Sequence, residues 1–502
     1  MDGTGTSEDQ IDILIVGAGI SGIDAAWHLK HRRSGTSFAI VEAKDQLGGT
    51  WAQHRFPGIR SDSDLFTFGF SWKPWMGVPI ATAEEILSYL DEAVAEQDLS
   101  ETIRFNTKVL SADWSSARQG WRVVLETPEG PSTLSCKFLW MCAGYYRHEA
   151  GFLPDWPGMD AFDGPIIHPQ NWPEGLDYAG KDVIVIGSGA TAATLIPAMA
   201  AEAGMVTMVQ RSPTWFLPRP QTDEFRETMA KLDLPDETYH AVMRQYALHN
   251  SEMIARRARE DPDGLAEELL GYVRAYLGPD FDIDTHFRPR YRPWRQRIAI
   301  VPDGDLFRAI ARGDAGVVTG QIDRFVAEGL RMQDGQIVRG DIIVAATGLT
   351  LCNFGQVDLA VDGVAFDPAD SVTHRGLMFT GLPNFASVFG YLRSSWTLRA
   401  DLVADYLCRL FEHMEAEGQA VVRPVLRPED ADMAIRPWIV EEDFNPGYIT
   451  RALDILPKQG DRQPWVMTQD YYLDVEDLPA ARFDDGTLVY EAERVAVGVS
   501  QS

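Results

Sequence analysis

Glycine residues recur twice in the chain at a spacing that binds the pyrophosphate of a dinucleotide. The first set is Gly17, Gly19 and Gly22, and the second is Gly187 and Gly189 followed by Ala192. Small residues at this spacing allow a tight turn, a close approach of backbone amides to phosphate oxygens and close packing of the next helix. The pattern therefore predicts two dinucleotide sites, with Ser188 and Thr191 at the second one.

The residues that follow the two glycine sets differ in charge. Glu42 stands about 20 positions after Gly22, where a carboxylate accepts hydrogen bonds from ribose hydroxyls. The matching place after the second set carries Arg211 and then Ser212. Because arginine binds a 2′-phosphate bidentately, the first site suits the adenosine of FAD or NAD and the second suits NADPH. The alternative for Arg211 is an ordinary surface arginine.

Strands and helices must position these residues. Apolar β-branched runs at 12–16 and 182–186 lead into the glycine sets, and runs at 38–41 and 205–209 lead to the charged residues. A helix-like stretch follows each glycine set, and the runs 138–144 and 341–348 are predicted to return as strands. This alternation predicts an α/β fold with two Rossmann-like dinucleotide-binding domains.

The composition excludes several classes of partner. The chain has 502 residues and a formal net charge of -29, which opposes binding to nucleic acid and to anionic membranes. We expect no signal peptide, no membrane span and, from four scattered cysteines, no metal site and no dithiol redox pair. We therefore expect a cytoplasmic protein that is a monomer or a weak homo-oligomer.

Two longer motifs resemble a known family, the type I Baeyer–Villiger monooxygenases among the class B flavoprotein monooxygenases. One motif is F-x-G-x-x-x-H-x-x-x-W-P, matched by Phe162, Gly164, His168, Trp172 and Pro173. The other runs from Gly48-Gly49-Thr50-Trp51 through Phe56-Pro57-Gly58 to Asp62. The stretches 293–305 and 395–401 are similar to the branch that includes the ethionamide-activating monooxygenases.

The resemblance implies a reaction. NADPH reduces FAD, O2 adds to give a C4a-peroxyflavin, and this species converts ketones to esters or lactones and sulfides to sulfoxides. The substrate would be a small ketone or sulfide. The alternative is a flavin-containing N- or S-monooxygenase without ketone activity, whose linker motif lacks the Trp172-Pro173 ending.

The resemblance also implies roles for single residues. Arg297 matches the active-site arginine of the family, with Arg295 and Arg292 as alternatives among the five arginines of 288–297. Asp62 matches the carboxylate that holds this arginine, with Asp64 as the alternative. The alternative interpretation is that the arginines form a basic surface patch and that Asp62 caps a turn.

Other residues are expected to contact the cofactors or to join the domains. Gly49, Thr50, Trp51 and Val109 are expected to line the flavin. Trp396 reaches the nicotinamide side or, equally well, packs in the core. His168 is expected to have a positional role in the linker between the cofactor domains and no role in proton transfer.

The glycine sets and the linker motif suggest a domain division. We expect an FAD-binding domain from residues 1–150 and 375–502, with the NADPH-binding domain, 151–374, inserted into it. Within the insert, 218–290 is rich in Glu, Ala, Leu, Arg and Met at helical spacing. We expect this segment to form a helical subdomain that covers the active site.

Overall fold

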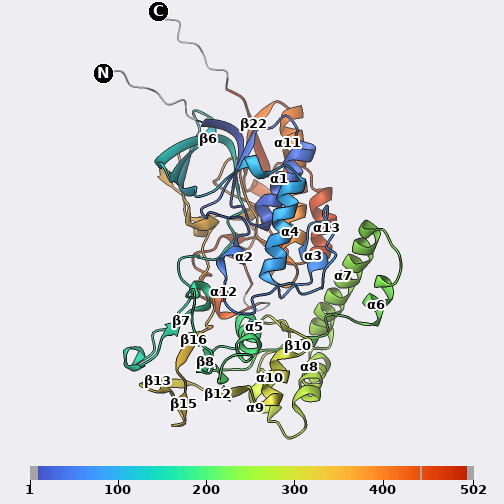
Figure 1. Cartoon of the computed structure of the whole chain (residues 1–502). Helices are drawn as coiled ribbons and strands as arrows, with labels where there is room; N and C mark the ends of the chain where they lie inside the picture. The colour runs from blue at the N-terminus through green and yellow to red at the C-terminus, as the bar shows by residue number, and fades with distance from the viewer. Residues whose placement is uncertain (1–8, 441–443, 495–502) are drawn as a thin grey trace, which may run out of the picture.

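The structure is a computed structural model, and it describes residues 9–440 and 444–494. The outer ends of the expected FAD-binding segments, 1–8 and 495–502, and residues 441–443 lie outside the described residues. Two units are stacked in Figure 1, each built on its own sheet. The first unit contains the first glycine set, and the second unit contains the second set. The predicted α/β fold with two nucleotide-binding sheets is confirmed.

The first unit is built on a nine-stranded sheet whose central strands are parallel. β1 lies between β2 and β6, so that Val16, Val41 and Met141 end side by side. The loops that follow these strands therefore meet at one edge of the sheet. The strands are β1 Asp9–Val16, β2 Phe38–Val41, β3 Ile103–Arg104, β4 Lys108–Ser115, β5 Gly120–Thr127, β6 Gly130–Met141, β17 Asp358–Val361, β18 Val364–Ala365 and β21 Phe385–Ser387.

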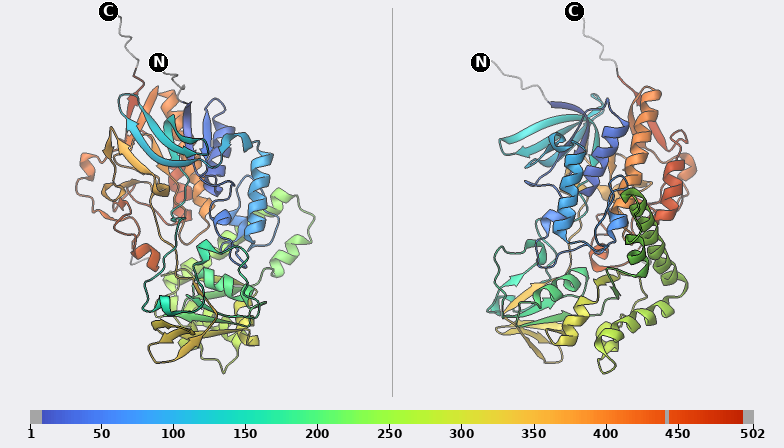
Figure 2. Two further views of the ribbon diagram at one scale, coloured as in Figure 1. Left: turned by 60° about the vertical axis from the view of Figure 1, so that its left-hand side comes forward. Right: turned by 45° about the vertical axis from the view of Figure 1, so that its right-hand side comes forward.

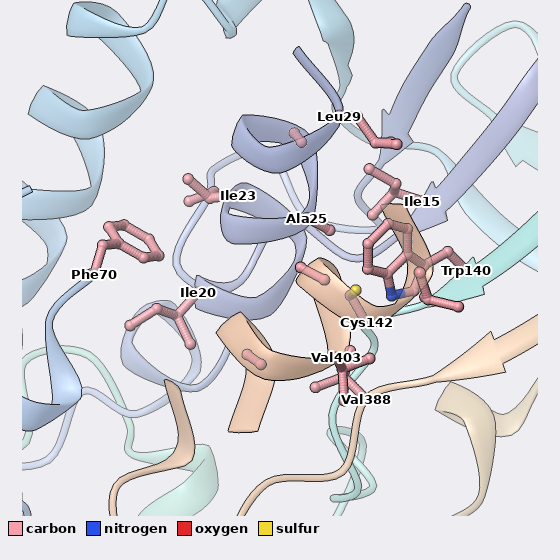
Figure 3. Close-up of a cluster of buried hydrophobic side chains, with 14 of the residues drawn as sticks. Ile15, Ile20, Ile23, Ala25, Leu29, Phe70, Trp140, Cys142, Val388 and Val403 are labelled. Carbon is pink, nitrogen blue, oxygen red and sulfur yellow. The ribbon is translucent and has the colours of Figure 1, made fainter. Parts of the chain in front are cut away.

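The main core of the first unit lies between this sheet and its helices. Figure 3 shows Ile15 and Trp140 of the sheet on the side of the helix α1 that carries Ala25 and Leu29, with Val403 of α11 near Trp140, whereas Ile23 points to the other side of α1. These side chains are fully buried, so the sheet and the helix that flank the first glycine set are held together by an apolar core. The helices of this unit are α1 Ile20–Arg32, α2 Thr50–Gln53, α3 Leu65–Phe68, α4 Ala83–Glu96, α11 Trp396–Ala416, α12 Gly447–Thr450 and α13 Tyr471–Ala480.

Three two-stranded ribbons complete the part of the first unit that is formed late in the sequence. They are β19 Thr373–His374 with β20 Met378–Phe379, β22 Gln419–Pro424 with β25 Leu488–Ala492, and β23 Arg436–Pro437 with β24 Lys458–Gln459.

The second unit has a five-stranded parallel sheet in the order β12-β9-β8-β16-β7. Ile186 at the end of β8 lies between Val209 of β9 and Ala345 of β16, which again brings three loops to one edge. The elements are β7 Ile166–Ile167, β8 Asp182–Ile186, α5 Ala190–Met199, β9 Met205–Gln210, α10 Asp305–Arg312, β12 Ala315–Thr319 and β16 Ile342–Ala345. Two further sheets pair β10 Phe216–Arg219 with β11 Ala299–Pro302 and join β13 Ile322–Val326, β14 Gly329–Met332 and β15 Ile337–Arg339.

Four helices occupy the segment in which the sequence predicts a helical insertion. They are α6 Glu224–Ala230, α7 Asp236–Glu260, α8 Pro262–Leu277 and α9 Ile283–Phe287. Figure 2 shows α7 rising from the second unit beside the helices of the first, and the His240 ring of α7 accepts from the Trp75 amide at 2.9 Å. The described residues of these helices line neither of the two cavities described below. The segment therefore links the two units, and the described residues of its helices contribute nothing to the lining of either cavity.

The chain returns to the first sheet earlier than the expected boundary at residue 375. β17 pairs in parallel with β4, for example Leu359 with Ala112, so residues 358–365 belong to the first sheet. Sequence periodicity cannot detect this return, because β17 and β18 are short and the strand β4, with which β17 pairs, lies far away in the sequence.

No helix among the described residues has the length and apolarity required to cross a membrane.

Candidate active site between two nucleotide cavities

The first glycine set folds as the sequence predicts and opens onto a cavity of about 370 Å³. Gly17 has a φ of +106°, and a Cβ there would lie 2.7 Å from the Cys142 carbonyl oxygen. Gly22 packs so tightly that a Cβ would lie 1.9 Å from the Gly17 carbonyl oxygen. Gly22 therefore holds α1 against β1, while Gly17 and Gly19 line the cavity. This is the cradle that a dinucleotide pyrophosphate requires.

Glu42 is buried at the wall of the same cavity, at the end of β2. Its carboxylate accepts from the backbone amides of Ala18 at 2.8 Å and Lys44 at 3.0 Å. A carboxylate has about four acceptor positions, so it keeps capacity for ribose hydroxyls. Burial lowers the pKa of Lys44 to about 8, although the neighbouring charge of Glu42 acts to raise it.

The other residues expected to contact the flavin also line the first cavity. They are Gly49, Thr50, Trp51, Val109 and Trp396. The indole Nε1 of Trp396 donates to Ser21 Oγ at 2.8 Å, and its ring stacks on Tyr145 with centroids 5.0 Å apart. Trp396 therefore packs in the wall of the cavity at the start of α11.

The second glycine set opens onto a separate cavity of about 650 Å³. Gly187, Ser188, Gly189, Thr191, Arg211 and Ser212 all line it. Ser188 Oγ lies 2.9 Å from Thr214 Oγ1, which links the glycine turn to the loop after β9. Arg211 is exposed, and within residues 9–440 and 444–494 no carboxylate lies within ion-pair distance of it. A cation in this state can accept a phosphate without first losing a protein partner.

Arg297 and Asp62 line both cavities and lie between them. The pair is bidentate, with Arg297 Nε 2.7 Å from Asp62 Oδ2 and Nη2 2.9 Å from Oδ1. Burial acts to lower the pKa of Arg297, but Asp62 and the three neighbouring tyrosines, Tyr448, Tyr145 and Tyr146, together raise the pKa above its usual range. The guanidinium is therefore a permanent positive charge at the junction of the cavities.

The alternatives to this pair have other partners or face elsewhere. Asp64 is buried and pairs with Arg219 and Arg226 at 3.0 Å each. Arg288 pairs with Glu267 and Asp284. Of the five arginines in 288–297, all of which the structure describes, only Arg297 lines either of these two cavities. The structure thus brings together the two residues that the family resemblance singled out.

Three tyrosines around Arg297 were missed by sequence reasoning. The hydroxyls of Tyr145 and Tyr146 are hydrogen-bonded to each other at 2.8 Å. The Tyr146 ring contacts the Tyr448 ring edge to face, with centroids 6.2 Å apart. Burial raises the pKa of all three phenols, so they are neutral hydrogen-bonding groups at ordinary pH. No motif in the sequence links these three tyrosines. Tyr145 and Tyr146 follow β6, whereas Tyr448 lies about 300 residues later.

His168 lies outside both cavities and contacts backbone atoms. Its Nδ1 accepts from the Gln170 amide at 3.2 Å, and its Nε2 therefore carries the hydrogen and donates to the Gly348 carbonyl at 3.0 Å. Burial lowers its pKa, so the ring is neutral. His168 ties the linker after the first unit to the end of β16.

This arrangement can hold two nucleotides whose reactive ends meet at one fixed positive charge. Such a site suits a reaction in which reducing equivalents pass between two cofactors and an anion forms beside the guanidinium.

Known proteins show the same sequence pattern. Residues 79–233 match the model of the flavin-binding monooxygenase-like family, and residues 15–76 match an NAD(P)-binding Rossmann-like domain. The FAD-containing monooxygenase EthA of Mycobacterium tuberculosis is 42% identical over 98% of this chain and 100% of its own length. The probable FAD-binding monooxygenase AlmA of Acinetobacter baylyi is 42% identical over 96% of this chain and 97% of its own.

Solved structures share the fold. An open crystal structure of cyclohexanone monooxygenase has a TM-score of 0.70 at 22% identity, covering 84% of this chain and 90% of that one. A complex of OTEMO with FAD and NADP has a TM-score of 0.75 at 21% identity, covering 96% and 100%. Identities this low support the fold alone. The 42% identity to EthA over 98% of the chain confirms the flavin monooxygenase prediction, and the chain belongs to the FAD-containing monooxygenases.

Proposed function

We propose that the chain uses NADPH and O2 to convert ketones to esters or lactones and sulfides to sulfoxides. The observation that carries this proposal is the Arg297–Asp62 pair, which lies on the wall of both nucleotide cavities. Ketone oxygenation passes through anionic species, and a preorganised positive charge stabilises such species in a site with little water. The relatives' FAD-containing monooxygenase names agree with the proposal but do not name a substrate class.

We infer that FAD binds in the first cavity, where Gly17, Gly19 and Glu42 would hold its adenosine and pyrophosphate. The bound flavin would take reducing equivalents from NADPH, activate O2 and supply the oxygen atom that is transferred. Thr50, Trp51 and Val109 would contact it along the same wall.

In the second cavity Arg211 and Ser212 would bind the 2′-phosphate of NADPH, and the turn at Gly187 and Gly189 would bind its pyrophosphate. The unpaired state of Arg211 within the described part of the chain supports this role.

Arg297 would orient and stabilise the anion that forms at the junction, and Asp62 would fix the direction of the guanidinium. The tyrosine hydroxyls at 145, 146 and 448 would fill the remaining space with neutral donors and exclude water. Substrates would then be small ketones or thioethers without a charge of their own, because the site offers aromatic surface and a single paired cation.

The test is to supply purified enzyme with NADPH, air and either a cyclic ketone or an aryl methyl thioether. Lactone and sulfoxide are both expected, each in proportion to the NADPH consumed. Sulfoxide without lactone would instead indicate an N- or S-monooxygenase. NADPH oxidation without either product would contradict the proposal for these substrate classes.

A further inference from the structure

Residues 60–64 carry a charged side chain at every second position, and each of these side chains forms an ion pair with the second unit. Arg60 pairs with Asp305 of α10 through contacts of 2.6 and 3.2 Å. Asp62 pairs with Arg297, which leads into β11. Asp64 accepts from Arg219 at the end of β10 and from Arg226 of α6. We call these three groups of ion pairs the charged ladder.

The backbone of the ladder is fixed to the first unit. The Ser61 amide donates to the Ala81 carbonyl at 2.8 Å, and the Leu65 amide donates to the Pro79 carbonyl at 2.7 Å. The segment thus lies on the first unit, and its alternate side chains reach the second.

Asp64 is the most deeply buried acidic group of the ladder, with an exposed fraction of 4%. Besides its two arginines it caps α3, because its Oδ1 accepts from the Phe66 amide at 3.1 Å. The Arg226 guanidinium also lies over the rings of Phe66 and Tyr246. Asp64 therefore fixes α3 of the first unit to α6 and β10 of the second.

The ladder joins Asp64 to the active-site pair through two short connections. Asp64 is two residues from Asp62 in the sequence. On the other side, Arg219 lies on β10, which pairs with β11 in parallel, and Arg297 stands two residues before β11. Asp62 and Arg297 thus each belong to, or lie next to, a segment that is held by the ion pairs of Asp64 with Arg219 and Arg226.

We propose that Asp64, with Arg219 and Arg226, is a positioning site that sets the register between Asp62 and Arg297. Asp64 lines neither cavity, so it acts through the ion pair and does not touch the reactants. The inference rests on the proposed function of Arg297. A misplacement of about 1 Å in an active site costs on the order of 100-fold in rate, so a loosened register is measurable.

The experiment compares Asp64→Asn with Arg219→Gln and with a control, Glu268→Gln. Glu268 of α8 forms an ion pair with Arg257 of α7 and contributes no side chain to the ladder. For each holoenzyme one measures product formed per NADPH, hydrogen peroxide released, the rate of flavin reduction by NADPH and the visible flavin spectrum of the resting enzyme.

We expect Asp64→Asn to lower product per NADPH about tenfold and to raise peroxide correspondingly, because a loosened ion pair exposes the reacting centre to water. Flavin reduction stays within about twofold of wild type, and the flavin spectrum shifts because Asp62 moves against the cavity wall. Arg219→Gln keeps the Arg226 contact and should give a smaller change, about threefold. Glu268→Gln should change none of these quantities.

A wild-type product yield in folded Asp64→Asn would overturn the inference. If that variant does not fold, Arg219→Gln decides: a wild-type yield and an unshifted spectrum would overturn the inference, and a raised peroxide fraction supports it. A wild-type enzyme that forms neither lactone nor sulfoxide would instead refute the proposed function itself.

A double-variant cycle separates positioning from an independent effect. If Asp64 acts through Asp62, the double variant Asp62→Asn/Asp64→Asn should lose no more product than Asp62→Asn alone. Losses that multiply would show that the two carboxylates act independently and would contradict the proposal.

Discussion

Arg297 keeps its charge at ordinary pH, because a guanidinium is protonated there and because Asp62 and the neighbouring tyrosines together raise its pKa despite burial. Arg297→Ala should therefore remove anion stabilisation and leave hydride transfer largely intact. We expect product formation to fall at least about 100-fold, the usual cost of losing such a donor, while flavin reduction stays within about threefold. Stopped-flow reduction and product analysis measure the two steps separately.

The adjacent variant Arg295→Ala is the control, because Arg295 lines neither cavity. It should retain product formation. Unchanged lactone or sulfoxide formation in Arg297→Ala would refute its assignment as the active-site arginine.

Arg211 is expected to discriminate between the two nicotinamide cofactors. Its loss removes a charge-assisted contact worth about 1.5–3 kcal/mol to a 2′-phosphate that NADH lacks. Arg211→Ala should thus weaken NADPH binding about 10- to 100-fold and NADH binding hardly at all, as measured by titration. The exposed Arg331 on β14 provides the control substitution. Equal effects on both cofactors would contradict a 2′-phosphate contact.

At the residue scale, the sequence was sufficient where a motif fixes a local geometry. Gly17, Gly22 and Glu42 occupy the expected places because strand, turn and helix follow one another locally. The Asp62–Arg297 contact joins residues 235 apart, and it was expected from the family resemblance and not from local geometry. The tyrosine cluster and the partners of Asp64 depend on contacts between segments more than 100 residues apart, and spacing alone carries no information about such contacts.

At the element scale, the contact between α1 and α11 contains a buried acidic group. Asp24 of α1 is fully buried, accepts from Trp72 Nε1 at 3.0 Å and lies near His28 and Asp401. Burial, reinforced by the charge of Asp401, raises the pKa of Asp24 to about 7, despite opposing effects of His28 and Arg244. The folded protein thus retains a proton that the unfolded chain releases near its ordinary value.

This contact predicts a fall in stability as pH rises. Between about pH 4 and pH 7 the folded state binds more protons at Asp24 than the unfolded state, so the free energy of unfolding decreases with pH. Asp24→Asn removes this contribution and still accepts from Trp72. We expect its melting temperature to fall less than that of wild type between pH 5.5 and about 8. Parallel melting curves over this range would contradict a raised pKa of Asp24.

The elements that the sequence predicted least well are those without a strong local pattern. The strands and helices around both glycine sets are long and apolar, and they form as expected. β17 and β18 are short and join the first sheet only through β4, so the expected boundary at residue 375 falls after them.

At the scale of the whole molecule, the two units are joined by the linker, the helical insertion and the charged ladder. His168 fixes the linker through two contacts to backbone atoms, and Gly151 packs against its ring. His168→Ala should therefore lower the melting temperature by a few degrees, because it removes buried hydrogen bonds worth about 1–3 kcal/mol. The product formed per folded enzyme should stay within about threefold.

Differential scanning calorimetry and a pH–rate profile test this interpretation. The profile of His168→Ala should match that of wild type in shape. Loss of an acid or base limb from the profile, with the melting temperature unchanged, would indicate proton transfer by His168.

The order of the segments in the first unit bears on how the protein is made. β21 pairs with β6, and Gln356 and Trp396 line the same cavity as Gly17. A ribosome must therefore synthesise the whole second unit before the first sheet and its cavity can be completed. The second unit can fold while the chain is still growing, whereas the first unit waits for contacts across more than 300 residues. Flavin incorporation should accordingly be a late event in biosynthesis, and chains truncated before residue 396 should emerge without bound flavin.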